Sequence, residues 1–369
     1  MAEDFEFGIE EEYFLADANS GRSPAAASLD AFHEAASERV EPASHELLKG
    51  QVEVQSEPGT SFAAARDALA GMRAELSTIA RTHGLRLFSA GSHPLGHEDE
   101  QHTTEKQRYK RLEAEFGMIA GRSMVCAMHV HVSVPDPDRR IDLMNRLLPF
   151  LPLFYALSTS SPFWQGHDTQ LKGFRLAAFS EWPRMGLPEV FADKAGYDLF
   201  IDRLVTAGVI ENSSFVWWLI RPSNKYPTLE MRVCDSCTRL DDAIAIAALY
   251  RSLVRTVHRR PDLNAGFGPV ERGLCAENIW HAQQDGPAAT FVDAVRGGTV
   301  SVDRALDAAL ELTREDAAAL GDTRWVEATR DILGRGSSAD RQLAAFRDRG
   351  ESEAALRAVV ERLAEETLA

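Results

Sequence analysis

The sequence predicts an α+β fold built on a curved antiparallel sheet, with helices on its convex side and a helical C-terminal part. In four segments, charged and apolar side chains alternate with the period of two that is typical of a half-buried strand. These segments are residues 7–15, 49–57, 128–134 and 229–233. Longer segments with apolar residues at helical spacing lie between and after them. The content of hydrophobic (44%) and charged (26%) residues is ordinary for a folded globular chain.

The first predicted strand carries three consecutive glutamates. Glu10 and Glu12 point to one face, while Glu11 points to the other face together with Ile9 and Tyr13. The two carboxylates that share a face are about 7 Å apart and repel each other, which a divalent cation between them would offset. The segment therefore indicates a metal site, and the alternative is a solvated acidic strand near the terminus.

Each of the other three predicted strands has polar side chains on one face and apolar ones on the opposite face. The polar side chains are, in chain order, Glu53, Gln55, His129, His131, Glu230 and Arg232. A single histidine is usually a satisfied core or surface residue, and a Glu-x-Arg pair is usually a surface ion pair. If the four strands are neighbours in one antiparallel sheet, however, their polar side chains share a concave face.

The residue types on this face indicate metal-assisted phosphoryl transfer. Carboxylates with an imidazole are ligands for Mg2+ or Mn2+, and these cations commonly share their coordination shell with phosphates. Arginine adds a fixed cation that binds phosphate or carboxylate through two hydrogen bonds. A zinc ribbon is not expected, because Cys234 and Cys237 form a single CxxC pair without a second one.

Helical spacing and local stop signals predict the remaining elements. In order, we expect a helix over 61–83, a strand over 85–89, a helix over 138–158, a strand over 215–220, and helices over 240–258 and 351–368. Ser61 or Thr60 would cap the first helix and Gly84 would end it. Pro149 and Pro152 are expected to break or kink the helix in which they lie.

The chain is expected to change character near residue 260. Beyond residue 261 a bias toward Ala, Leu, Arg, Glu and Asp predicts helices, with a break at 334–338. We therefore expect an α+β sheet region over 1–260 that carries the candidate site, and a helical region over 261–369 packed on the same domain. The loop over 91–104, rich in His, Gly and acidic residues, is expected near the mouth of the site.

Bulk properties limit the partners of the protein. The net charge of −16 argues against nucleic acid or an anionic membrane, because the field of the whole protein repels phosphate. No apolar run approaches the ~18 residues of a membrane span. The first residues lack the basic and apolar regions of a signal peptide, and four cysteines in 369 residues fit a reducing compartment. We therefore expect a cytoplasmic protein that binds small molecules.

Several different short motifs follow one another along the chain. They are Gly8-Ile9-Glu10-Glu11-Glu12-Tyr13, Val52-Glu53-Val54, Met128-His129-Val130-His131-Val132, Ser161-Pro162-Phe163-Trp164-Gln165-Gly166-His167-Asp168-Thr169 with Arg175, Pro183-Arg184-Met185-Gly186-Leu187-Pro188, Leu229-Glu230-Met231-Arg232-Val233-Cys234-Asp235, Glu277-Asn278-Ile279-Trp280 and Ala339-Asp340-Arg341-Gln342. This set resembles the carboxylate-amine ligase family, the type 2 glutamate-cysteine ligases related to glutamine synthetase. The resemblance covers nearly the whole chain.

The resemblance implies a glutamine synthetase-like catalytic sheet and an ATP-dependent ligase. In such an enzyme a carboxylate is phosphorylated to an acyl phosphate, which an amine then attacks. The implied substrates are L-glutamate, through its γ-carboxylate, and L-cysteine, through its amine. Mg2+ is the implied metal, with Mn2+ as an alternative. Carried over residue by residue, the metal ligands are Glu10, Glu12, Glu53, His129 and Glu230.

The resemblance also implies roles for three arginines and a histidine. Arg221 and Arg232 would neutralise the transferring phosphoryl group, and His131 would lie beside the nucleotide. Arg175 is the candidate for holding the substrate carboxylate. For Arg175 and Arg221 the alternative is an ordinary ion pair with one of the 56 acidic residues.

Two other functions stay open at this point. A guanidino-type kinase uses a related sheet but binds phosphates mainly through arginines, so a face rich in Glu and His disfavours it. A metabolite-binding protein that retains the sheet is the non-enzymatic alternative, and Mg-dependent ADP release would separate it from a ligase. The identity of the carboxylate and of the amine, and the choice between monomer and homodimer, also stay open.

Overall fold

A seven-stranded sheet forms the centre of the protein. The computed structural model describes residues 5–41, 43–293 and 297–369. The strands of the sheet are β1 (Phe7–Asp17), β2 (Ser44–His45), β3 (Gln51–Gln55), β4 (Leu85–Phe88), β5 (Met128–Ser133), β10 (Ile220–Pro222) and β11 (Thr228–Met231). Their order is β10-β11-β5-β1-β3-β2, and β4 pairs with β1 beyond this path. Every pairing in the sheet is antiparallel.

The four strands expected from alternation are neighbours in this sheet, so that prediction is confirmed. In the register, Glu10 lies opposite His129 on β5, and Glu12 lies opposite Glu53 on β3. Glu230 lies opposite His131. The polar side chains of four separate segments are therefore brought to the same face and to adjacent levels of the sheet, which is the arrangement that a shared site requires.

The opposite face of β1 is buried against α2 (Phe62–Thr82). Glu11 points to this face, where its carboxylate accepts hydrogen bonds from Arg73 at 2.5 and 3.0 Å and from the Tyr13 hydroxyl at 2.6 Å. The side chains of Glu11 and Arg73 are 0% and 1% exposed. The central glutamate of the triplet is therefore a core residue, because strand alternation turns it away from its two neighbours.

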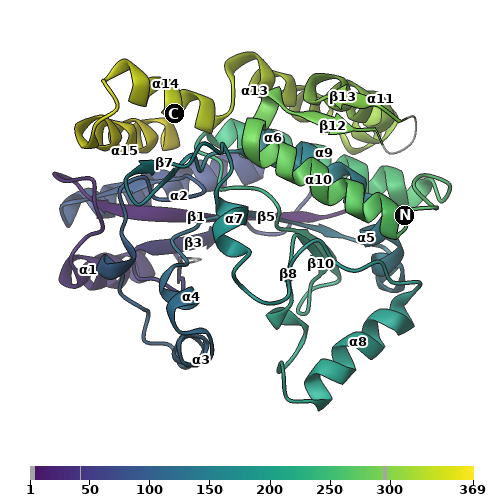
Figure 1. Ribbon diagram of the computed structural model, residues 1–369, viewed down its shortest axis with the longest axis horizontal. Coiled ribbons are helices and arrows are strands. Elements are labelled where there is room, and N and C mark those ends of the chain that lie inside the picture. Colours follow the sequence, from purple (N-terminus) through teal and green to yellow (C-terminus); the bar gives the residue numbers. More distant parts are fainter. Residues whose placement is uncertain (1–4, 42, 294–296) are drawn as a thin grey trace.

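The helices are distributed unequally over the two sides of the sheet (Figure 1). Besides α2 they are α1 (Ala26–Arg39), α3 (Gln107–Phe116), α4 (Met118–Gly121), α5 (Arg140–Leu147), α6 (Leu151–Ser158), α7 (Arg175–Phe179), α8 (Lys194–Thr206), α9 (Leu240–Arg259), α10 (Pro269–Asp285), α11 (Val302–Leu320), α12 (Thr323–Glu327), α13 (Thr329–Arg335), α14 (Ser338–Asp348) and α15 (Glu353–Thr367). In the view of Figure 1 the long helices from α9 onward cover one side of the sheet, and α3, α4 and α8 lie on the other side. No helix in the described ranges is long and apolar enough to cross a membrane.

The predicted helices are found close to their expected bounds. Ser61 caps α2 by accepting a hydrogen bond from the amide of Ala64, and Gly84 follows the helix with a φ of 71°. The helix expected over 138–158 is divided into α5, a 3-10 turn over Leu148–Phe150 and α6, as the two prolines indicated. Gly336 separates α13 from α14 at the expected break.

The C-terminal helices share their core with the sheet region. One large apolar cluster runs from Phe5 to Ile332 and includes buried residues of α9, α10 and α11. The helices are interrupted by a hairpin that the sequence did not indicate, formed by β12 (Thr290–Val292) and β13 (Thr299–Ser301). The division of the chain near residue 260 stays a prediction.

The prediction of a single strand over 215–220 is wrong. A 3-10 turn occupies Ser213–Phe215, and β9 (Trp217–Trp218) pairs in parallel with β8 (Met185–Gly186) outside the main sheet. The amides of Trp217 and Leu219 donate to carbonyls of Arg184 and Gly186, so the chain is bound to this segment before it enters the main sheet as β10. The remaining short strands, β6 (Phe163–Trp164) and β7 (His167–Asp168), form another hairpin.

We expect the buried pair between Glu11 and Arg73 to dominate the stability of the sheet. Glu11→Gln leaves a buried guanidinium without its counter-charge, and should lower the free energy of unfolding by about 3–5 kcal/mol in denaturant titrations. Glu311→Gln is the matched control, because its partner Arg314 and Glu311 itself are 71% and 64% exposed. The control should lose less than about 1 kcal/mol. Equal losses in the two variants would contradict the central role of the buried pair.

Candidate active site

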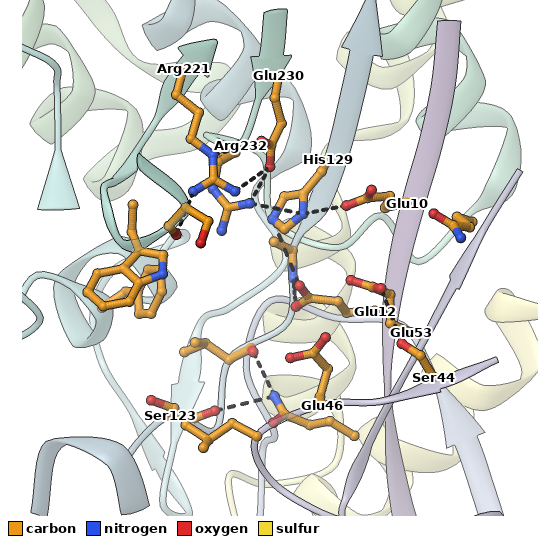
Figure 2. Close-up of a pocket in the computed structure, with 18 of the residues that line it drawn as sticks. Glu10, Glu12, Ser44, Glu46, Glu53, Ser123, His129, Arg221, Glu230 and Arg232 are labelled. Atoms are coloured by element: carbon orange, nitrogen blue, oxygen red, sulfur yellow. Dashed lines mark hydrogen bonds and ion pairs between the residues drawn. The ribbon is translucent and has the colours of Figure 1, made fainter. Parts of the chain in front are cut away.

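A cavity of about 810 Å3 lies over the face of the sheet that carries Glu10 and Glu12 (Figure 2). Side chains of β1, β3, β5, β10 and β11 form its floor. All nine residues singled out from the sequence line it: Glu10, Glu12, Glu53, His129, His131, Arg175, Arg221, Glu230 and Arg232. The structure thus brings the sequence-predicted residues together, and their chemical roles stay predictions.

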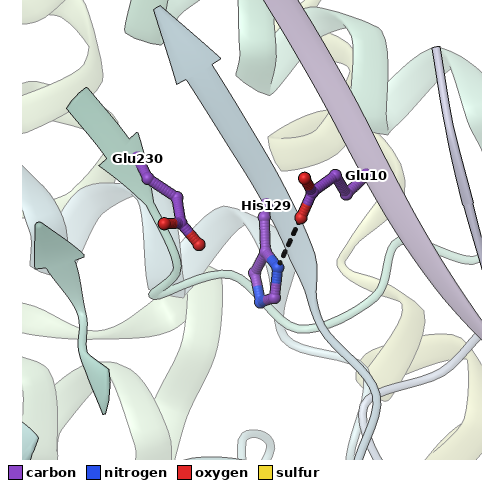
Figure 3. Close-up of side chains that lie close together, drawn as sticks. All are labelled: Glu10, His129 and Glu230. Carbon is purple, nitrogen blue, oxygen red and sulfur yellow. Dashed lines mark hydrogen bonds and ion pairs between the residues drawn. The ribbon is translucent and has the colours of Figure 1, made fainter. Parts of the chain in front are cut away.

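His129 occupies the centre of the charged floor. Its Nδ1 is 3.2 Å from Glu10 Oε2, and its Nε2 is 3.8 Å from Glu12 Oε1. His131 stands beside it, with Nε2 3.3 Å from the other oxygen of Glu10. Figure 3 shows His129 between Glu10 and Glu230, with all three side chains directed toward one another from three neighbouring strands. The two imidazoles therefore tie the carboxylates of β1 to those of the adjacent strands.

Two groups of side chains in the described ranges could hold a metal ion. One consists of Glu10, His129 and Glu230, and the other of Glu12, Glu53 and His129. Within each group the ligand atoms lie within 4.8 Å of one another. The two groups together contain the five residues predicted as metal ligands. Oxygen-rich sets with a single imidazole suit Mg2+ or Mn2+ better than zinc.

Two arginines surround Glu230 at one end of the floor. Arg221 donates from Nε and Nη2 to the two carboxylate oxygens at 2.7 and 3.1 Å, and Arg232 forms a further hydrogen bond to Oε1. Arg221 is fixed in turn by carbonyl groups of Ser214 and Val216. Two guanidinium groups thus face one carboxylate, and this end of the cavity carries an excess of positive charge that suits an anionic ligand.

Arg175 lies in the wall of the cavity as part of a buried network. Its Nε donates to Asp235 at 2.9 Å, and its Nη2 lies 2.6–3.1 Å from the carbonyl oxygens of Arg232, Val233 and Cys234. Asp235 also accepts hydrogen bonds from the amide of Ser160 and the hydroxyl of Ser161. The ion pair left open as an alternative for Arg175 is therefore present. A role in holding a substrate carboxylate stays a prediction.

The carboxylates of the floor differ in pKa. Burial and the neighbouring carboxylate of Glu53 raise the pKa of Glu12 to about 8. Burial also opposes ionisation of Glu10, but hydrogen bonds to the two histidines outweigh it and hold the pKa of Glu10 below its usual value. Burial lowers the pKa of His129 to about 4, and the charge of Arg232 adds to this effect. Around Glu12 and Glu53 the site has more carboxylates than cations, which favours a bound cation.

Sequence reasoning missed several residues that line the cavity. Glu46 follows the two-residue strand β2, which is too short to show alternation. Gln51 shares its face of β3 with Glu53 and Gln55, so the same alternation could have identified it. Trp182 comes from an irregular segment and Trp217 from the two-residue strand β9, and neither is long enough to show a periodic signal.

The loop over 91–104, expected near the mouth of the site, does not line the cavity in the described structure. Its His93 is buried and packs edge-on against Phe14 and Phe88, with ring centroids 5.5 and 5.1 Å apart. The amides of Leu95 and Gly96 donate to its Nδ1. His93 therefore serves an apolar cluster and a turn. Thr104, at the end of the loop, donates hydrogen bonds to the carbonyls of the cavity-lining residues Glu46 and Leu47, so a position of the loop near the mouth of the site stays a prediction.

Comparison with known proteins gives consistent results. The family model described as glutamate-cysteine ligase family 2 matches residues 6–362. A protein of Bradyrhizobium diazoefficiens named "Putative glutamate--cysteine ligase 2" is 42% identical over 355 residues, which are 96% of this chain and 83% of that protein. A protein of Rhodospirillum rubrum with the same name is 41% identical over 374 residues, covering 99% and 96% of the two chains.

Solved structures share the fold at low sequence identity. A glutamate-cysteine ligase of Francisella tularensis, determined in complex with AMP, has a TM-score of 0.68 at 12% identity and covers 99% of this chain and 89% of that one. A bifunctional glutathione synthetase of Pasteurella multocida has a TM-score of 0.71 at 14% identity, covering 98% and 52%. These likenesses support the glutamine synthetase-like fold class. The match of the family model over almost the whole chain shows that the protein belongs to glutamate-cysteine ligase family 2.

Proposed function

We propose that the protein is an ATP-dependent ligase that joins a carboxylate to an amine through an acyl phosphate. The proposed substrates are L-glutamate, through its γ-carboxylate, and L-cysteine. The observation that carries the proposal is the presence, over one cavity floor, of two carboxylate-imidazole groups beside a pair of arginines. Phosphoryl transfer depends mostly on positioning and on neutralising charge, and these are the groups that supply both.

The residues of the floor fit a divalent cation. Three carboxylates, Glu12, Glu53 and Glu46, are buried close together, and mutual repulsion contributes to the raised pKa of each. A bound cation relieves this repulsion, and the proposed ligands are Glu10, Glu12, Glu53, His129 and Glu230. When bound, Mg2+ or Mn2+ would neutralise the charge of the ATP phosphates.

The arginine end of the cavity suits the transferring phosphoryl group. Arg221 is held by two carbonyl groups and by Glu230, so its planar guanidinium is already oriented. Arg232 keeps its Nε without a hydrogen-bond partner in the described structure, although this atom is buried. An unsatisfied buried donor is costly, and an anionic ligand would satisfy it. We assign both arginines to the phosphoryl group.

His131 is the proposed neighbour of the nucleotide. Its Nδ1 lies 2.9 Å from the hydroxyl of Thr228, and its ring is 6.2 Å from the ring of Tyr226, which is itself 41% exposed at the cavity rim. The hydroxyl contact fixes the orientation of the imidazole, and the exposed aromatic ring is available for stacking on a base.

In the proposed reaction an oxygen of the substrate carboxylate attacks the γ-phosphorus of ATP, and the bond to the β-phosphate breaks. The amine then attacks the carbonyl carbon, and phosphate leaves with the oxygen that came from the carboxylate. A guanidino-type kinase lacks this second step and needs no amine. Membership of glutamate-cysteine ligase family 2 favours the ligase.

Isotope transfer tests this mechanism. L-glutamate labelled with heavy oxygen in its γ-carboxylate should yield labelled inorganic phosphate and ADP when L-cysteine and Mg-ATP are present, as measured by mass spectrometry. Hydroxylamine should replace the amine and trap the acyl phosphate as a hydroxamate. Label recovered in AMP would contradict the proposal, because an adenylate then replaces the acyl phosphate. If no carboxylate gives a hydroxamate, a metabolite-binding protein is the better account.

Metal binding can be tested without turnover. Mg2+ or Mn2+ should raise the melting temperature of the wild-type protein, because a ligand of the folded state stabilises it. Glu12→Gln removes one proposed ligand and should reduce this rise, while the exposed Glu38→Gln should retain it. EDTA should abolish ADP release by the wild-type protein. Full activity in EDTA, or equal metal-induced shifts in the two variants, would reject the site.

The raised pKa of Glu12 predicts a pH-dependent stability difference. The ordinary pKa of a glutamate is 4.5 and that of Glu12 is about 8, so ionising Glu12 in the folded protein costs stability that grows as pH rises through this window. In EDTA, the Glu12→Gln variant should be as stable as the wild type at the acidic end of this window, near pH 4.5. At its alkaline end, near pH 8, the variant should be more stable by roughly 1–3 kcal/mol. Thermal unfolding at several pH values measures this. A difference that is constant with pH would contradict the assignment.

A further inference from the structure

Asp235 is a buried carboxylate that the proposed reaction does not use. It lies in the segment after β11 and is not among the residues that line the cavity in the described structure. Its side chain is 0% exposed, and that of its ion-pair partner, Arg175, is 2% exposed. Burying two charges costs desolvation free energy that their mutual attraction only partly offsets, so stability alone is a weak reason for such a pair. Its place beside the cavity, which Arg175 lines, points to a role in holding other groups in position.

Arg175 uses this pair to hold the backbone that follows β11. Its Nε donates to Asp235 Oδ1 at 2.9 Å. Its Nη2 lies 3.1, 2.6 and 2.9 Å from the carbonyl oxygens of Arg232, Val233 and Cys234. A guanidinium is planar, so the contact that fixes Nε on the carboxylate also fixes the direction of Nη2. Three consecutive peptide groups, the first of which belongs to Arg232, are thereby bound to one side chain.

Asp235 is held in turn by the chain that precedes α7. Its Oδ2 accepts hydrogen bonds from the amide of Ser160 at 2.9 Å and from the hydroxyl of Ser161 at 2.6 Å. The same hydroxyl accepts a hydrogen bond from the amide of Arg175 at 3.0 Å. Both carboxylate oxygens therefore have partners, and a closed ring of hydrogen bonds fixes the two members of the ion pair relative to each other.

The backbone at Gly91 leaves Asp235 no room to move. A Cβ atom at Gly91 would lie 2.5 Å from Asp235 Cγ and 2.6 Å from its Oδ2. The amide of Gly91 also donates to the hydroxyl of Ser160 at 2.7 Å, so this approach is itself held by a hydrogen bond. The position needs a glycine because of the close approach of the backbone to the carboxylate. A larger residue there would displace Asp235.

The segment of Asp235 also holds Glu12, on the side of the cavity that is proposed to bind the cation. Asp235 pairs through its backbone with Ala127, whose amide donates to Glu12 Oε2 at 2.7 Å. The hydroxyl of Ser236 donates to the carbonyl of Glu12 at 2.6 Å. Figure 2 shows Arg232 and Glu12 directed into the same cavity from different strands. The place of Asp235 thus sets the position of Arg232 relative to Glu12.

We propose that Asp235 is a positioning residue for phosphoryl transfer, which acts through Arg175 and through the backbone around it. This inference rests on the proposed ligase function, in which Arg232 neutralises the phosphoryl group and Glu12 binds the cation. Both groups must be correctly placed at the same moment, and a misplacement of about 1 Å can lower the rate about a hundredfold. Loss of the Asp235 carboxylate should therefore lower kcat, while binding of the substrates in the ground state changes little.

Asp235→Asn tests this inference with little change in volume. Hydroxamate formation is measured with Mg-ATP, hydroxylamine and whichever amino-acid carboxylate the wild-type protein converts. We expect kcat to fall about ten- to a hundredfold, and KM for Mg-ATP and for the carboxylate to stay within about threefold of the wild type. Ser161→Ala removes one hydrogen bond to the carboxylate, and Gly91→Ala displaces it. Both should lower kcat in the same way, and they carry the test if Asp235→Asn does not fold.

Two control variants separate positioning from a general loss of stability. Asp322 pairs with Arg251 in a similarly buried ion pair, with side chains 4% and 2% exposed, and neither residue lines the cavity in the described structure. Asp322→Asn should lower the melting temperature, as Asp235→Asn does, but keep the kcat of the wild type. A Cβ atom at Gly71 would meet nothing within 4 Å, so Gly71→Ala is the control for Gly91→Ala and should leave kcat unchanged.

The contrary outcomes distinguish this inference from the ligase proposal. The melting temperature shows that each variant is folded at the temperature of the assay. Folded Asp235→Asn or Ser161→Ala protein with the kcat of the wild type overturns the inference alone. An equal fall in kcat for Asp322→Asn also overturns it, because lost stability then accounts for the effect. A rise in KM for the carboxylate alone overturns it too, since Arg175 then contacts that substrate. A wild-type protein that forms no hydroxamate rejects the ligase proposal and this inference together.

Discussion

The buried contacts of Arg73 hold together four parts of the chain that are distant in sequence. The guanidinium binds Glu11 on β1 and donates to the carbonyl oxygens of Cys237, Thr238 and Thr367. Helix α2, the central strand, the segment after β11 and the end of α15 therefore meet at one side chain. A buried guanidinium is tolerated only when its charge and its donors are satisfied, and here they are. The geometry of the sheet depends on this junction.

The buried pair between Glu11 and Arg73 also helps to explain how the protein tolerates an acidic cavity. Strand alternation sends Glu11 into the core and its neighbours Glu10 and Glu12 to the cavity, so one triplet of identical residues serves stability and chemistry separately. The floor places carboxylates next to one another and leaves the pKa of Glu12 raised, which costs stability in the absence of a cation. The apolar core and the buried ion pairs behind the sheet offset this cost. Strain of this kind is common where a site must bind charged ligands.

Alternation made the floor of the site predictable from the sequence. The faces of β1, β3, β5 and β11 follow directly from the period of two, and the antiparallel order then brings Glu10, Glu53 and His129 together. Arg73 was not predictable, since no local pattern distinguishes it among the 40 basic residues. Glu46 and Trp182 were not predicted as site residues either, because β2 has only two residues and Trp182 lies in an irregular segment. The 215–220 segment was misread because its partner, β8, lies about 30 residues earlier in the chain and outside the main sheet.

The charge distribution of the cavity gives the proposed reaction a direction. Arg221 and Arg232 give one end of the cavity its positive charge, and Glu12, Glu46 and Glu53 make the rest of the floor acidic. In the proposed reaction the transferring phosphoryl group would lie at the arginine end, beside the carboxylates that would hold the cation. This separation of charge follows from the strand order that places β10 and β11 on one side of β1 and β2 on the other.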